Sequence, residues 1–280
     1  MNTENREIKV LDKGFVRLVD SMGDDSSITE AARTSYGKQT KTVRDDTGLI
    51  RYLMRMNHTS PFEFVEFKFH IKCPIFVMRQ KIRHRTASVN EYSGRYSVMT
   101  DDCYIPELDR ITSQSTSNNQ GSTNDILENA SDIQEIMKFQ TEESLKEYHG
   151  FLDSGLSREI ARINLPLSNY TELYWKIDLH NLFHYLKLRM DSHAQYEIRV
   201  FAEAIYELIK PIVPIACEAF EDYRINACNF SFKEMDVIRY LLMEKNIPVE
   251  DIKAIIQKLD NGLSKREITE LISKLGYISG

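Results

Sequence analysis

Residues 64–72 read FVEFKFHIK and determine how the surrounding chain must fold. Val65, Phe67, Phe69 and Ile71 are apolar, whereas the residues between them are charged or carry an imidazole ring. Side chains of a β-strand point alternately to its two faces, so this period of two places the apolar residues on one face. The stretch therefore predicts a strand with one face buried in a core.

The chain after this strand is expected to turn directly into a helix. Proline is favoured in the first helical turn, where its missing N–H would have no intrahelical partner. Pro74 begins such a stretch, PIFVMRQKIRHR, residues 74–85. Ile75, Met78 and Ile82 recur at helical spacing and are expected to face inward.

Shorter helical patterns lie on both sides of this pair of elements. The capping-box spacing of Ser27-Ile-Thr-Glu30 predicts the start of a short helix, and an apolar stripe follows Thr47 at helical spacing. Residues 112–125, TSQSTSNNQGSTND, are too polar to bury and predict an exposed loop or a disordered insert. Residues 126–149 and SREIARINLPL, residues 157–167, look helical, and Pro166 ends the second.

Two regions in the last part of the chain are expected to be helical. Residues 178–210 show one long helical pattern with little turn chemistry, and its apolar face is expected in the core. That face comprises Leu182, Phe183, Leu186, Ile198, Phe201, Ile205 and Leu208. From about Ser231 two or three small amphipathic helices are expected, one of them opened by the capping box Ser264-Lys-Arg-Glu267.

Composition limits the class of protein. A chain of 280 residues suffices for one large domain or one domain plus a small appendage, and its net charge of −6 argues against a general nucleic-acid binder. Four cysteines without CxxC spacing indicate reduced thiols in a cytoplasmic protein. The N-terminus lacks the apolar core of a signal peptide, and no apolar run approaches the roughly 18 residues of a membrane span, so no membrane partner is expected.

The segment QKIRHRTASVNEYSGRYS, residues 80–97, is the strongest candidate for a functional site. Arginine presents a planar fork of donors that suits phosphate and carboxylate oxygens, and Arg83, Arg85 and Arg95 lie close together here. Gly94 lets a backbone N–H approach an anion closely. The pattern predicts an anion site; the alternative is a solvated basic face neutralised by acidic residues elsewhere.

A second group of candidates lies in LHNLFHYLKLRMDSHAQYE, residues 179–197. His180 and His184 are four apart and share a helix face, whereas Arg189 lies on roughly the opposite side of an unbroken helix. A metal site on the two histidines is the alternative, but spacing indicates no third ligand and no HExxH motif is present. No metal is therefore expected.

Two further patterns carry less information about function. NHTSPFEF, residues 57–64, contains a capping box from Ser60 to Glu63, which is a sufficient structural explanation for those residues. GxSxG and a glycine-rich phosphate loop are both absent. With 11 glycines in the chain, a dinucleotide would have to be held by arginines and side-chain hydrogen bonds instead of a Rossmann turn.

Four segments, in order, resemble one enzyme family. RHRTASVNEYS, residues 83–93, resembles the RHR-x7-S signature of the flavin-dependent thymidylate synthases, and Gly94 and Arg95 continue its extended form. NHTSPFE precedes this segment, and REIARINLPL and LRMDSHAQYE follow it. The resemblance runs from about Val10 to Asn229, whereas the helices after about residue 230 match no part of the family core.

The resemblance implies both a fold and a reaction. It implies an α/β fold of the α+β type, a mostly antiparallel sheet flanked by helices, over residues 1–229, with a helical C-terminal extension over 230–280. It implies methylation of dUMP at uracil C5 to give dTMP and tetrahydrofolate. Methylenetetrahydrofolate supplies the carbon, and FAD reduced by NADPH supplies the hydride. A cytoplasmic homotetramer with active sites shared between subunits is also implied.

The resemblance also implies roles for individual residues. Contacts to dUMP are expected from Gln80, Lys81, Ile82, Arg83, Glu91, Tyr92, Ser93, Gly94, Arg95, Arg162 and Arg189. Contacts to FAD are expected from Ser60, Arg83, His84, Arg85, Glu91, Asp178, Leu179, His180 and His184, with His58 near the flavin ring and the folate. The dUMP phosphate is expected on residues 93–95, on a neighbouring subunit from Arg83.

Arg189 matches the residue that the family uses to activate the uracil. A fixed guanidinium stabilises the negative charge that develops on N3 and the carbonyl oxygens, which makes C5 a better nucleophile without a covalent enzyme adduct. An older alternative makes Ser93 the nucleophile. An unassisted serine has no visible general base, so phosphate binding is its expected role.

The sequence departs from the family pattern at three places. Asp178, His180 and His184 stand where some members carry Asn, Arg and Asn, which predicts weaker FAD binding above the unperturbed histidine pKa of about 6.5. The polar stretch 112–125 is longer than a compact member needs, and the role of residues 230–280 stays open. Two other classes remain as alternatives, namely a nucleotide- or nucleic-acid-binding module without chemistry and a metal-dependent hydrolase.

Overall fold

The computed structural model describes residues 7–34, 43–116, 121–259 and 262–277. The chain divides into two compact units, Met1–Asn226 and Ala227–Gly280, which are described separately. No helix within these described ranges is long and apolar enough to cross a membrane.

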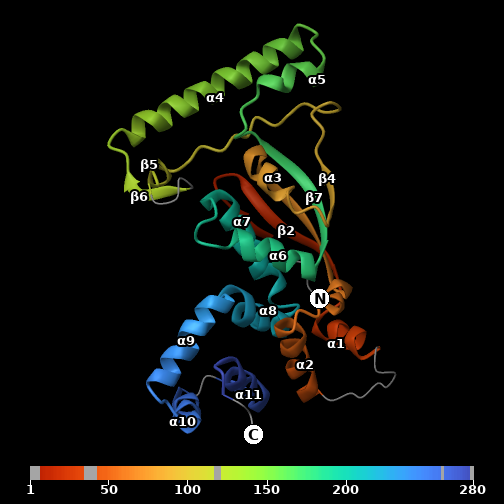
Figure 1. Cartoon of the computed structure of the whole chain (residues 1–280). Coiled ribbons are helices and arrows are strands. Elements are labelled where there is room, and N and C mark those ends of the chain that lie inside the picture. Colours follow the sequence, from red (N-terminus) through yellow and green to blue (C-terminus); the bar gives the residue numbers. More distant parts are fainter. Residues whose placement is uncertain (1–6, 35–42, 117–120, 260–261, 278–280) are drawn as a thin grey trace. The chain divides into compact units, whose positions relative to one another are not determined.

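The first unit is built on a five-stranded antiparallel sheet with the order β1-β2-β3-β7-β4 (Figure 1). Its strands are β1 (Glu7–Val10), β2 (Gly14–Met22), β3 (Glu66–Pro74), β4 (Ser88–Glu91) and β7 (Tyr170–Asp178). β3 pairs with β2 on one side and with β7 on the other, so the FVEFKFHIK stretch lies at the centre of the sheet. The mostly antiparallel sheet flanked by helices is confirmed.

One face of β3 is buried, as the sequence predicts. Val65, Phe67, Phe69 and Ile71 are each at most 1% exposed, whereas the alternate residues are partly exposed. On the opposite face His70 stacks on Tyr174 of β7, with ring centroids 4.9 Å apart. The sheet therefore has one apolar face and one polar face, which is how an antiparallel sheet covered on a single side is built.

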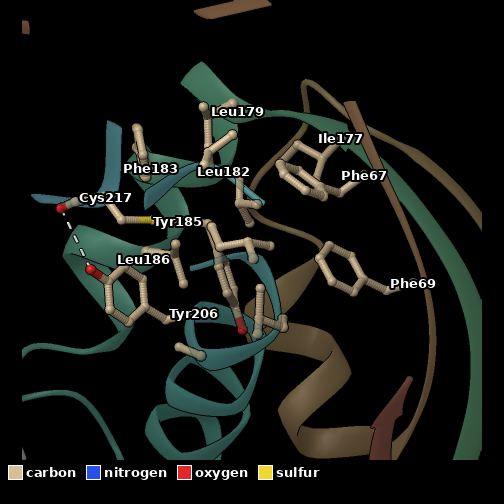
Figure 2. Packing of buried hydrophobic residues seen from close by; sticks show 14 of the residues in the cluster. Phe67, Phe69, Ile177, Leu179, Leu182, Phe183, Tyr185, Leu186, Tyr206 and Cys217 are labelled. Carbon is tan, nitrogen blue, oxygen red and sulfur yellow. Dashed lines mark hydrogen bonds between the residues drawn. The ribbon is translucent and has the colours of Figure 1, made fainter. Parts of the chain in front are cut away.

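Helices cover the apolar face. They are α1 (Asp25–Thr34), α2 (Val43–Arg55), α3 (Ile75–Lys81), α6 (Leu179–Arg189), α7 (Tyr196–Ile209) and α8 (Pro214–Phe220). Figure 2 shows Leu182 and Leu186 of α6 packed in the same core as Phe67 and Phe69 of β3. Burial of this continuous apolar surface is the main stabilising contribution to the unit.

Residues 178–210 form two helices, so the prediction of one long helix is wrong. α6 ends at Arg189 and α7 begins at Tyr196. In the turn between them the Asp191 carboxylate accepts a hydrogen bond from the backbone N–H of His193 at 2.8 Å. Such side-chain bonds to the backbone compete with helix formation, and an apolar pattern does not reveal them. The predicted apolar positions on both helices are nevertheless buried, except Leu208, which is partly buried.

Three local predictions about helix ends need correction. α3 ends at Lys81, so Ile82 lies beyond it and is 48% exposed, while Lys81 turns inward instead. α1 begins two residues before Ser27, because the Asp24 carboxylate accepts hydrogen bonds from the N–H groups of Ser26 and Ser27. Ser60 lies inside the short 3-10 helix η1 (Ser60–Phe64), which has no side-chain cap, so the expected capping box does not form.

The polar stretch 112–125 contains a hairpin in place of the expected loop. β5 (Thr112–Gln114) pairs with β6 (Ser122–Ile126), and residues 117–120 lie outside the described residues. Strand pairing uses backbone groups, so it does not require apolar side chains. The elements that follow are α4 (Ala130–Asp153), α5 (Arg158–Ala161) and the 3-10 turn η3 (Arg162–Asn164), which ends before Pro166 as expected.

The second unit consists of α9 (Phe232–Glu244), α10 (Val249–Leu259) and α11 (Lys265–Lys274), within the two or three helices expected. The predicted capping box from Ser264 to Glu267 opens α11, and a similar box from Ser231 to Glu234 opens α9. Inside this unit the Arg239 guanidinium donates a hydrogen bond to the Lys274 carbonyl at 3.0 Å, which ties the first helix to the last.

Candidate active site

Arg189 lies beside a cavity of about 770 Å³, here called the Arg189 pocket. The end of α3, the turn between α6 and α7, and the β5–β6 hairpin all contribute to its wall. Polar lining residues include Gln80, Arg110, Arg189, His193, Gln195 and Glu197. A cavity of this size is within the range of small-molecule sites, about 300–1,000 Å³.

Two bonds hold the half-buried Arg189 guanidinium in one orientation. Its Nε donates to His84 Nε2 at 3.2 Å, and its Nη2 donates to the Gln80 backbone carbonyl at 3.2 Å. Gln80 lies in the last turn of α3 and His84 lies three residues beyond its end, whereas Arg189 is the last residue of α6. The loop that carries the RHR motif therefore positions an arginine that lies far from it in the sequence.

His84 acts as a neutral acceptor in this arrangement. Partial burial, followed by the charge of Arg189, lowers the pKa of His84 to about 4. The ring is therefore uncharged near neutral pH, and its Nε2 lone pair is available to Arg189. The structure brings His84 against Arg189, whereas the sequence assigned His84 to FAD.

Lys81 is directed into the core, which limits its expected contact with dUMP to the backbone. Its Nζ lies 3.5 Å from the centre of the Trp175 ring and 4.3 Å from that of Tyr185. The residue is 2% exposed, and Nζ has no hydrogen-bond acceptor among the described residues. Burial lowers the pKa of Lys81 to about 7. The expected contact of Lys81 with dUMP therefore stays a prediction, and in this arrangement only its backbone could make it.

The arginine-rich segment is ordered because part of it joins the sheet. β4 pairs with β7, and Tyr92 continues the ladder by donating its N–H to the Glu172 carbonyl at 2.8 Å. The Glu91 carboxylate accepts a hydrogen bond from the Thr171 hydroxyl at 2.9 Å, and the Tyr92 hydroxyl donates to the Val98 carbonyl at 2.6 Å. Strand pairing thus supplies the anchor that the polar sequence did not reveal.

The expected phosphate-binding residues meet at the end of β4, in what is here called the β4 edge: Ser93, Gly94, Arg95 and Arg162. A Cβ added to Gly94 would lie 2.6 Å from Met99 Sδ and 2.9 Å from Arg162 Cδ, so glycine allows Arg162 to pack against the backbone. Arg162 is exposed and has no ion-pair partner among the described residues, whereas Arg95 pairs with Glu159 at 3.1 Å. The β4 edge shares no residue with the lining of the Arg189 pocket.

A third group lines a cavity of about 230 Å³, here called the histidine pocket. His58, His180 and His184 meet there, and the rings of the last two have centroids 4.4 Å apart. Partial burial, then the proximity of His180 and of Arg224, lowers the pKa of His184. Among the residues that the structure describes, no group of three or more His, Cys, Asp or Glu side chains is arranged to hold a metal ion.

Several residues expected to contact FAD have other positions or tasks. Asp178 caps α6 by accepting hydrogen bonds from the N–H of Asn181 at 2.9 Å and from its side chain at 2.7 Å. Leu179 is fully buried, so its side chain cannot touch a ligand at the surface. Ser60, Arg83 and Arg85 are exposed and line none of the cavities described above.

The sequence did not single out several polar residues that the structure brings to these sites. Arg224 and Lys187 line the histidine pocket, and Arg224 donates hydrogen bonds to the Met54 carbonyl and the Asn57 side chain. Gln195 and Glu197 line the Arg189 pocket. LRMDSHAQYE contained both of the latter, but nothing in its spacing indicated a role for them.

Comparisons with known proteins identify the family of the chain. Residues 17–215 match the family model described as "Thymidylate synthase complementing protein". A flavin-dependent thymidylate synthase of Ehrlichia ruminantium (strain Gardel) is 51% identical over 271 residues, which is 96% of this chain and 88% of that protein. One from Treponema denticola is 50% identical over 262 residues, covering 92% of this chain and 98% of that protein.

The chain belongs to the flavin-dependent thymidylate synthase family. A crystal structure of the UMP/dUMP methylase PolB from Streptomyces cacaoi, bound with 5-Br dUMP, superposes with a TM-score of 0.71 at 33% identity. That superposition covers 78% of this chain and 99% of the methylase. The family resemblance inferred from four motifs is therefore confirmed.

The comparisons also revise the interpretation of the C-terminal unit. The family model ends at residue 215, so Ala227–Gly280 lies outside it. The alignment with the Ehrlichia ruminantium enzyme nevertheless covers 96% of the chain and must include most of that unit. The C-terminal helices are therefore shared with at least one flavin-dependent thymidylate synthase, although the sequence motifs gave them no counterpart.

Proposed function

We propose that this flavin-dependent thymidylate synthase methylates dUMP to dTMP, with FAD reduced by NADPH as hydride source and methylenetetrahydrofolate as carbon donor. The observation that carries the proposal is the guanidinium of Arg189, held by His84 and Gln80 at the wall of a cavity large enough for a nucleotide. A preorganised cation stabilises charge that develops on a bound ring without reorganising during the reaction.

Arg189 is the proposed catalytic residue. It donates to the uracil ring and stabilises the negative charge that appears as C5 becomes nucleophilic. His84 remains neutral and keeps the guanidinium aimed at the ring, since its lowered pKa prevents a repulsive imidazolium. No serine or cysteine nucleophile is needed for this role.

The histidine pocket fits part of FAD. Arg224 and Lys187 supply positive charge for phosphates, and Phe183 and Phe62 supply apolar surface beside His58, His180 and His184. FAD supplies hydride when bound, after reduction by NADPH. The cavity of about 230 Å³ is smaller than the usual range for whole ligands, so the rest of FAD requires another surface. We propose that Ser60, Arg83, Arg85 and Glu91 provide it.

A homotetramer with shared active sites accounts for the separation of the dUMP residues. The β4 edge has two exposed arginines, Arg95 and Arg162, that suit a phosphate, yet it shares no lining residue with the Arg189 pocket of the same chain. We propose that the β4 edge of one subunit completes the Arg189 pocket of another. Ile82 and Tyr92, both exposed next to these residues, then lie at the same site.

Two further assignments belong to this proposal. Residues 1–229 form the catalytic domain, and residues 230–280 form a helical extension; the two compact units support this division. The protein is placed in the cytoplasm, where its four free cysteines, three of them buried, would stay reduced.

Replacing Arg189 by alanine tests the proposal. The variant is expected to lose dTMP formation by roughly a hundredfold to a thousandfold while its flavin absorbance and its thermal unfolding remain close to wild type. Arg79→Ala, on the exposed side of α3, is the matched control and is expected to retain activity. An Arg189→Ala enzyme within about threefold of wild-type turnover would refute the assignment of this arginine.

A further inference from the structure

A line of hydrogen bonds connects a buried carboxylate to the wall of the Arg189 pocket. Glu197 is 5% exposed, and its Oε1 accepts from the Tyr104 hydroxyl at 3.2 Å and from Arg110 Nε at 3.3 Å. Its Oε2 accepts from Gln195 Nε2 at 2.8 Å. Gln195 Oε1 in turn accepts from Gln80 Nε2 at 2.5 Å. Glu197, Gln195 and Gln80 are here called the Glu197 relay.

The relay has only one consistent direction. A carboxylate can only accept hydrogen bonds, so the NH₂ group of Gln195 must face Glu197 and its carbonyl must face Gln80. Gln80 must then turn its own NH₂ group toward Gln195. The orientation of an amide follows from its hydrogen-bond network, and this network starts from a group that cannot donate. Reversing either amide would oppose two acceptors or two donors.

This direction decides what Gln80 offers to a ligand. One N–H of Gln80 is donated to Gln195, which fixes the orientation of the amide, and the carbonyl Oε1 is then the one acceptor that the Gln80 side chain offers to an occupant of the cavity that it lines. Arg189, on the same wall, can only donate. The pocket thus presents a defined acceptor beside a defined donor.

We propose that Glu197 sets the base specificity of the pocket by holding Gln80 Oε1 as the acceptor for the N3–H group of uracil. This rests on the proposed function, because it takes the pyrimidine ring of dUMP to lie in the Arg189 pocket. Uracil has an N–H at position 3 between two carbonyl oxygens. Gln80 accepts from the N–H, while Arg189 donates to a carbonyl oxygen.

Cytosine reverses this pattern at two atoms. Its N3 is an acceptor and would face Gln80 Oε1, and its exocyclic amino group would face the Arg189 donor where uracil has O4. Both contacts oppose like groups, and a site built around defined donors and acceptors strongly rejects a ligand that leaves them unpaired. Glu197 touches no substrate atom in this scheme and is a positioning residue.

The test compares dUMP and dCMP binding by calorimetry in wild type and in Glu197→Gln. Glutamine at position 197 can donate as well as accept, so Gln195 and Gln80 are free to reverse together. The preference for dUMP over dCMP is expected to fall by about tenfold or more in the variant. An unchanged preference, within about twofold, would overturn the inference.

Tyr104→Phe is the matched control, because it removes one hydrogen bond to the same carboxylate and keeps that carboxylate. Its preference for dUMP is expected to stay within about twofold of wild type. Should Glu197→Gln fail to fold, Gln195→Met interrupts the relay at a more exposed position and is expected to lower the preference by a similar factor.

Binding and turnover separate this inference from the proposed function. A wild-type protein that prefers dUMP, loses the preference in Glu197→Gln, and makes no dTMP would refute the proposed reaction and support the relay. A protein that makes dTMP but keeps its preference in Glu197→Gln would refute the relay alone. Equal wild-type binding of dUMP and dCMP would also refute the relay.

Discussion

Replacing Lys81 by methionine is expected to stabilise the folded chain at neutral pH. The ammonium group of Lys81 is buried between the rings of Trp175 and Tyr185, and no hydrogen-bond acceptor for it lies in the part of the chain that the structure describes. A buried charge without a full set of partners is costly, whereas methionine has a similar length and no charge.

The size of the effect follows from the pKa and from the two rings. Burial lowers the pKa of Lys81 from 10.5 to about 7. This shift means that the folded chain destabilises the charged form of the lysine, relative to the neutral form, by about 5 kcal/mol more than water does. Cation–π attraction to the aromatic rings offsets about 2 kcal/mol of that cost. The free energy of unfolding of Lys81→Met should therefore exceed that of wild type by about 3 kcal/mol, which corresponds to roughly 6–12 °C in Tm.

The dependence on pH provides a second signature. Below the folded-state pKa of about 7 the lysine is charged in both the folded and unfolded states, so the advantage of methionine is complete. Between that pH and the unfolded pKa of 10.5, the unfolded chain binds more protons than the folded chain, and wild-type stability rises with pH. The difference between the two proteins should therefore shrink steadily toward alkaline pH.

Urea unfolding followed by circular dichroism at about pH 6.5 and about pH 9.5 measures both effects. Lys138→Met, on an exposed face of α4, is the control and is expected to change stability by less than about 0.5 kcal/mol. A Lys81→Met protein that is no more stable than wild type near pH 6.5 would show that the two rings compensate fully for burial. A gain that does not decline at alkaline pH would refute the role of the charge.

The remaining predictions concern the sites. His84→Ala removes the acceptor of Arg189 Nε and is expected to lower kcat by roughly tenfold to a hundredfold, with little change in the amount of bound flavin; unchanged kcat would show that Gln80 alone orients the guanidinium. Because the pKa of His184 is lowered, its charge should strengthen FAD binding only below about pH 6.5, so fluorescence titrations at higher pH should give similar affinities. Gly94→Ala should displace Arg162 and raise KM for dUMP severalfold at nearly constant kcat, and an unaltered KM would argue against phosphate binding at the β4 edge.

The sequence alone determined the central strand and the family. Alternation in FVEFKFHIK predicted a buried face on β3, and the structure buries those four apolar residues. The RHR motif and its three companion segments predicted membership of the flavin-dependent thymidylate synthases, which the comparisons confirm. Both signals are local in the chain, because a strand period and a motif are each contained within a few residues.

Only the tertiary structure decided which polar residues turn into the core and which polar segments join the sheet. Lys81 lies in a polar, arginine-rich stretch of sequence, yet the last turn of α3 directs it against Trp175 of β7. The polar segment 88–91 became a strand because β7 offered it a free edge. Neither outcome follows from local spacing, since each depends on an element almost a hundred residues later in the chain.

The arrangement of the active site was decided in the same way. Arg189 was recognised from its motif, but its alignment by His84, the packing of Arg162 on Gly94, and the direction of the Glu197 relay required the folded chain. Residue types limit which hydrogen bonds are possible, whereas strand order and helix ends determine which donors and acceptors meet. The sequence therefore specified the chemistry available to this protein, and the fold specified where and in which orientation that chemistry is presented.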